Sequence, residues 1–94
     1  MLYKLDEWKG ASGIWYCNCI AALTTDAAKW YAPARVLGIS PAEFIKLVIG
    51  KYGADQVRYS AESGFFSYGW TSQAKMRIYK NDINRIAREK NFQI

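Results

Sequence analysis

The sequence predicts a small α+β domain that spans residues 1–94, in which a β-hairpin packs on two to three helices. Residues 56–60 and 64–70 alternate apolar and polar side chains on either side of a short loop, which is typical of a hairpin. Residues at about 72–90 repeat apolar side chains at spacings of three and four, which predicts an amphipathic helix. The hydrophobic content of 51% is enough for one domain with a modest core.

The first quarter of the chain leaves its secondary structure open. Residues 1–8 alternate loosely and suit either a short edge strand or a frayed start, and Gly10–Gly13 predict a turn. The apolar run 14–23 begins with strand-favouring Ile, Trp and Tyr and ends with helix-favouring alanines. We expect a helix there, with a strand as the alternative, and burial in either form.

A break in the helical pattern is expected near Pro33. Thr24–Asp26 offer side-chain oxygens that can cap the free N–H groups of a helix beginning there. Pro33 lacks an N–H group and clashes with the preceding turn, so that helix should kink or end before it. A short helical turn over residues 34–37 should then end at Gly38, because glycine readily adopts the left-handed conformation found after helices.

The clearest helix start in the chain is at Ser40. Ser40 and Glu43 have the spacing of a capping box, and Pro41 stands at the first helical position, where its missing donor costs nothing. The helix should continue through Ile49 and stop near Gly50–Gly53. It is apolar on nearly all sides, so it should lie at the centre of the core or be covered by a second copy in a homodimer.

Most of the net charge lies in the last quarter of the chain. From Ser72 onward there are six basic and two acidic residues, which give +4 of the total of +5. An apolar stripe should face the core, formed by Met76, Tyr79, Ile83, Ile86 and Ala87. The polar side should face solvent, and the candidate partner-binding residues on this helix are Arg77, Lys80, Asn81, Asn84, Arg85 and Arg88. Two aromatic residues of the hairpin, Tyr68 and Trp70, are the candidate anchors beside them.

The residue types present argue against catalysis, cofactors and metals. The chain has no histidine, which removes the commonest general base and the commonest metal ligand. Cys17 and Cys19 are too close in sequence for an unstrained disulfide, so we expect two buried, reduced thiols and an intracellular, cytoplasmic protein. No apolar stretch is long enough to cross a membrane, and no signal peptide is evident. We therefore expect a non-enzymatic protein without cofactors.

Residues 30–94 resemble small proteins encoded by phages and mobile elements of Gram-positive bacteria. The resemblance lies in Ser-Pro-Ala-Glu-Phe at 40–44, in Tyr-Gly-Trp-Thr-Ser-Gln at 68–73 and in the segment 84–92. It implies a protein that binds and blocks a host or defence protein, in the manner of anti-CRISPR inhibitors, in the host cytoplasm. Such inhibitors commonly mimic DNA and are acidic, whereas this chain is basic, so it should act by another route.

Two functions are consistent with these features. The first is a binding protein that modulates or inhibits a macromolecular partner, most simply a protein, because Trp, Tyr and Arg dominate interface energies. The alternative is nucleic-acid binding, with cations on phosphates and aromatic rings on bases. Residues 34–49 also have the spacing of a helix-turn-helix, but Lys46 is the one cation of the second helix, which argues against DNA reading. The 15 aromatic residues, four Trp, seven Tyr and four Phe, are either core or interface.

Overall fold

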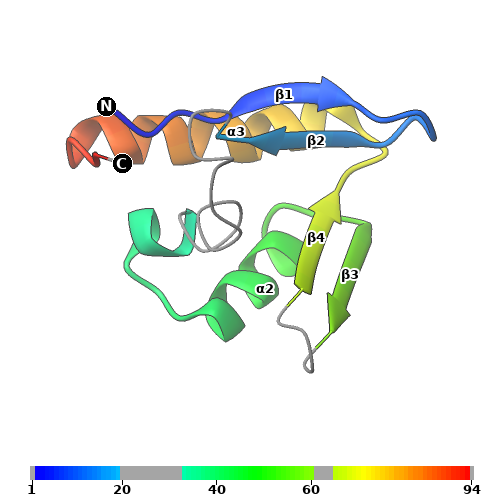
Figure 1. Cartoon of the computed structure of the whole chain (residues 1–94), viewed down its shortest axis with the longest axis horizontal. Coiled ribbons are helices and arrows are strands. Elements are labelled where there is room, and N and C mark those ends of the chain that lie inside the picture. The colour runs from blue at the N-terminus through cyan, green and yellow to red at the C-terminus, as the bar shows by residue number, and fades with distance from the viewer. Residues whose placement is uncertain (1, 20–32, 61–64, 94) are drawn as a thin grey trace.

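The computed structural model describes residues 2–19, 33–60 and 65–93, and confirms an α+β fold (Figure 1). The elements follow in the order β1 (Asp6–Lys9), β2 (Trp15–Asn18), a helical turn at 33–37, α2 (Pro41–Gly50), β3 (Gln56–Ser60), β4 (Phe65–Gly69) and α3 (Gln73–Glu89). The expected helix after Thr24–Asp26 and its interruption before Pro33 lie outside the described residues. The hairpin and the C-terminal helix are where the sequence predicts them.

The four strands form two antiparallel hairpins, β1–β2 and β3–β4. A single bridge joins the hairpins, in which Trp15 and Trp70 exchange backbone hydrogen bonds of 2.7 and 2.9 Å. Figure 1 shows β1 and β2 running alongside α3, with α2 beside β3 and β4. The expectation of a helix from residue 14 is wrong for Trp15–Asn18. Pairing with β1 and with Trp70 satisfies the backbone of this segment, and its aromatic residues suit a pleated surface.

The contact between the two hairpins requires glycine at position 69. A Cβ atom on Gly69 would lie 2.6 Å from Cγ2 of Ile14 and 2.8 Å from Cε1 of Tyr16, which is closer than side-chain atoms approach one another. The missing side chain therefore lets the β1–β2 hairpin settle on the end of β4. This contact positions β1 for its interaction with α3.

Aromatic residues supply the largest side chains of the described core. Trp70, Phe44 and Tyr79 are fully buried, with Trp70 and Tyr79 ring centroids 5.0 Å apart. The predicted inward stripe of α3 is confirmed, since Met76, Tyr79, Ile83 and Ala87 are 0% exposed. Of the two alternatives for the aromatic residues, core is therefore the main one in the described part of the chain, where each buried ring removes a large area from water.

Caps fix both long helices. Ser40 and Glu43 form the predicted capping box, with Pro41 in the first turn of α2. Ser72 caps α3 by accepting a hydrogen bond from the Lys75 N–H group. After α3, the Phe92 N–H group donates to the Ala87 carbonyl oxygen at 2.9 Å, and the partly buried Phe92 packs against the core.

The chain end then holds the N-terminal segment in place. Tyr3 donates its N–H group to the Phe92 carbonyl oxygen at 2.9 Å, and the two rings meet edge to face at 6.0 Å. Residues 3–9 consequently lie along α3, from the pairing with Phe92 to the end of β1 (Figure 1).

Candidate functional site

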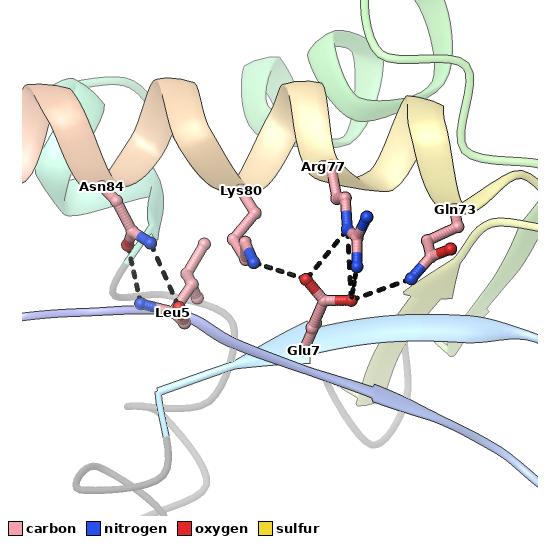
Figure 2. Close-up of polar contacts among 6 residues, drawn as sticks. All are labelled: Leu5, Glu7, Gln73, Arg77, Lys80 and Asn84. Atoms are coloured by element: carbon pink, nitrogen blue, oxygen red, sulfur yellow. Dashed lines mark hydrogen bonds and ion pairs between the residues drawn. The ribbon is translucent and has the colours of Figure 1, made fainter.

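Glu7 fixes β1 to one face of α3. Its carboxylate accepts hydrogen bonds from Nε of Arg77 at 3.1 Å, from Nζ of Lys80 at 2.5 Å and from Nε2 of Gln73 at 3.2 Å (Figure 2). The three donors are four and three residues apart, so the helix brings them together on one side. Hydrogen bonds from Arg77, Lys80 and Gln73 lower the pKa of Glu7 from 4.5 to about 2. Glu7 is therefore ionised at neutral pH and neutralises part of the charge of Arg77 and Lys80.

Asn84 holds Leu5, which lies two residues before Glu7 in the N-terminal segment. Its side-chain oxygen accepts from the Leu5 N–H group at 2.7 Å, and its amide nitrogen donates to the Leu5 carbonyl oxygen at 3.1 Å (Figure 2). The prediction that Asn84 faces solvent and a partner is wrong, because only 8% of the residue is exposed. The physical reason is that Leu5, the residue before β1, is buried, so its backbone N–H and C=O groups need hydrogen-bond partners within the protein. An amide supplies the donor and the acceptor at once.

A groove of about 500 Å³ lies between the N-terminal segment and α3. Lys4 and Asp6 line it from one side, and Lys80, Asn81 and Arg88 line it from α3. Lys4 and Arg88 are exposed, and neither forms an ion pair with any residue the structure describes. The groove thus combines two cations that are unpaired among the described residues with the Glu7 and Asn84 contacts, which hold the N-terminal segment against α3.

The predicted binding residues on α3 divide into two groups. Lys80, Asn81, Asn84 and Arg88 all line the groove, and Arg77 lies beside it on Glu7. Arg85 instead pairs with Glu89 at 3.1 Å, with both side chains more than half exposed. Such an exposed pair one helical turn apart contributes only a few tenths of a kcal/mol. Arg77 and Arg85 are therefore partly neutralised within the chain, and Arg88 is the predicted arginine left unpaired among the described residues.

The prediction of Tyr68 and Trp70 as surface anchors is wrong. Tyr68 is 8% exposed and Trp70 is 0% exposed. The Tyr68 hydroxyl lies 2.8 Å from the Tyr79 hydroxyl, and Nε1 of Trp70 donates to the Tyr52 carbonyl oxygen at 2.8 Å. The alternation of the hairpin was identified correctly, but this face packs on the helices because large rings remove the most apolar area from water.

An exposed aromatic residue that the sequence did not single out as an anchor is Trp8 on β1. It is 47% exposed, and its ring stacks on Tyr16 of β2 with centroids 4.5 Å apart and planes inclined by 22°. The Asn18 amide, in the orientation that satisfies both of its ends, accepts from Nε1 of Trp8 at 3.3 Å and donates to the Cys17 carbonyl oxygen at 3.2 Å. The indole is therefore held in one orientation. Strand alternation about the buried Leu5 was the signal that could have placed Trp8 outward.

The cysteines behave as core residues. Cys17 and Cys19 are both free and buried. Burial raises the pKa of the Cys17 thiol to about 12, so the nucleophilic thiolate is scarce at neutral pH. Among the residues the structure describes, no three Cys, Asp or Glu side chains gather where they could hold a metal ion.

No family model, curated protein or solved structure matches this chain. Within the described ranges, no helix has the length and apolar character needed to span a bilayer.

Proposed function

We propose that this protein is a non-enzymatic binding protein that modulates or inhibits a macromolecular partner, and that the partner is a protein. The observation that carries the proposal is the exposed Trp8, which stacks on Tyr16. Trp8 belongs to the same strand as Asp6, which lines a groove with two cations that have no ion pair among the described residues. Tryptophan and arginine are the residues that most often dominate binding energy at protein interfaces. A ring already held by Tyr16 loses little conformational freedom on binding.

The charge pattern of this region supports a protein partner over nucleic acid. Binding to a phosphate backbone requires unpaired cations on the protein, which release the counterions of the nucleic acid when they contact its phosphates. Here Arg77 and Lys80 form ion pairs with Glu7, and Arg85 forms one with Glu89. The acidic residue Asp6 also lines the groove. A mixed pattern with aromatic residues is typical of protein interfaces. The net charge of +5 is the argument for the nucleic-acid alternative.

A capture experiment tests the proposal. Tagged protein is incubated with bacterial lysate, with and without nuclease, and the retained material is identified by mass spectrometry. Given the resemblance to phage proteins, purified CRISPR nucleases are the first individual partners to test. Trp8→Ala should weaken the retained complex at least about 30-fold, as for a central aromatic anchor. Ile49→Ala is the matched control, because Ile49 on α2 is similarly exposed at 46%, and it should change affinity less than about threefold.

The salt dependence separates the two functions. A protein interface anchored by an aromatic residue should change its affinity only modestly between 50 and 200 mM salt, on the order of tenfold or less. Phosphate binding should weaken by orders of magnitude over the same range. If the nuclease removes all retained material, or if Trp8→Ala binds as well as the wild type, the proposal fails.

A further inference from the structure

The outer face of the β1–β2 hairpin places a carboxylate beside an open indole face. Successive strand residues point to opposite sides, so Asp6 and Trp8 share the side opposite Glu7, whose carboxylate is directed at α3 (Figure 2). Their Cα positions are two residues apart, roughly 6.5–7 Å along the strand. Across the hairpin, Asn18 stands opposite Asp6 and Tyr16 stands opposite Trp8. The outer face of this hairpin therefore combines one negative charge, one amide and two stacked rings.

Both groups are available to a ligand. Tyr16 covers one face of the Trp8 ring, while the residue remains 47% exposed. Asp6 is half-buried, and its carboxylate forms no hydrogen bond or ion pair with any residue the structure describes. Leu5, which precedes β1, and Cys17 of β2 are both buried, and both lie on the opposite, inner face of the hairpin.

We propose that Trp8 and Asp6 bind the guanidinium group of an arginine on the protein partner, an inference that rests on the proposed function. A guanidinium group is planar and weakly hydrated, so it can stack on the exposed indole face while its edge donates hydrogen bonds to a carboxylate. A lysine ammonium group can provide only one of these contacts well, because it is a compact, strongly hydrated charge. A phosphate group would be repelled by Asp6.

The neighbouring groove extends this recognition. Although its side chain shares the outer face with Trp8, Asp6 is also among the residues that line the groove, so the two surfaces adjoin at Asp6. The groove also contains Lys4 and Arg88, which are unpaired among the described residues. A partner segment that places its arginine on Trp8 and Asp6 would bring its next residues to these two cations. An acidic residue there is the complementary choice, so the partner segment carries an arginine close to an aspartate or glutamate. This mixed pattern is specific to protein and absent from nucleic acid.

The test uses small probes, so it does not depend on knowing the partner. ¹⁵N-labelled protein is titrated with N-acetyl-arginine methylamide, and the indole N–H signal of Trp8 is followed after assignment with Trp8→Phe. The control probes are the lysine and citrulline equivalents and adenosine monophosphate. Citrulline has the shape of arginine without the charge, so weak, millimolar binding is expected for arginine, less for lysine and none for citrulline.

Two variants of equal net charge locate the site. Asp6→Asn should weaken arginine binding at least about threefold, as expected for loss of a charge-assisted contact. Glu89→Gln removes a carboxylate that lies on α3 and should leave arginine binding unchanged. The inference is overturned if citrulline binds as well as arginine, if adenosine monophosphate alone shifts the Trp8 signal, or if the two variants behave alike. With an identified partner, loss of binding in Trp8→Ala but not in Asp6→Asn would overturn this inference while leaving the proposed function intact.

Discussion

Replacing Glu7 by glutamine tests whether the contact between β1 and α3 depends on charge. The substitution keeps the shape of the side chain but removes the charge that Arg77 and Lys80 contact. The shift of the Glu7 pKa from 4.5 to about 2 corresponds to about 3 kcal/mol if it were transmitted fully to stability. Water screens much of this energy, because 52% of the Arg77 side chain is exposed. We therefore expect Glu7→Gln to lower the free energy of unfolding by about 1–2 kcal/mol at pH 7.

The pH dependence gives this prediction a definite sign. The pKa of Glu7 is lower in the folded state, so its contribution is fully present above about pH 4.5 and is lost as the pH falls toward 2. Urea unfolding followed by circular dichroism at pH 7, 4.5 and 2.5 should show the difference between wild type and Glu7→Gln shrinking with acidification. Asp55 also has a lowered pKa, chiefly because of its hydrogen bond from Thr71, and so it adds its own pH dependence to the stability. This contribution is the same in wild type and Glu7→Gln, so it cancels in the difference between their free energies of unfolding.

The matched control is Glu89→Gln, which removes an exposed carboxylate paired with Arg85 on the same helix. It should cost no more than about 0.5 kcal/mol. A Glu7→Gln cost equal to that of the control, or a difference from wild type that does not change with pH, would refute the reasoning. In that case, the hydrogen bonds of Leu5 to Asn84 would be enough to hold the N-terminal segment on α3.

Three further predictions concern the parts that support the groove. Asn84→Ala should lower the free energy of unfolding by about 2–4 kcal/mol in urea titrations, because both backbone groups of Leu5 lose their buried partner; a loss below 1 kcal/mol would mean that water replaces the amide. Gly69→Ala should cost about 1–3 kcal/mol and reduce the near-ultraviolet dichroism of the stacked rings, since its Cβ would meet Ile14 at 2.6 Å. Native protein should react with a thiol reagent at pH 8 at least about 100-fold more slowly than protein in urea, because burial raises the pKa of Cys17 to about 12; equal rates would place that thiol at the surface.

The elements that the sequence predicts well are those specified by local signals. Ser40, Pro41 and Glu43 lie within four residues and determine the start of α2 through their own hydrogen bonds. The stripe of α3 repeats at helical spacing, and the structure buries four of its five members completely. In both cases the information lies within a few residues of the position it determines.

The candidate site depends on contacts between residues that are distant in sequence. Its prediction failed where those contacts determine whether a side chain is exposed and unpaired. A count of charges predicts that Arg77 and Lys80 are unpaired cations. In the structure both form ion pairs with Glu7, which lies 70 residues from Arg77 and 73 residues from Lys80 in the sequence. Asn84 looks like a solvent-facing polar residue until Leu5 is placed against it, 79 residues away. Spacing within α3 correctly separates inward from outward positions, but it cannot show which outward positions another segment covers.

The surface that is available to a partner consists of the side chains that these internal ion pairs leave unpaired. The cations of α3 that appear most numerous in the sequence are largely satisfied by Glu7 and Glu89. Pairing leaves Lys4 and Arg88 in the groove and leaves Trp8 and Asp6 on the outer face of β1. Because these four residues differ in charge and shape, they favour a partner with its own sequence of charges over a uniform polyanion. The N-terminal segment, which the sequence left without a role, therefore supplies three of the four groups on which recognition is proposed to depend.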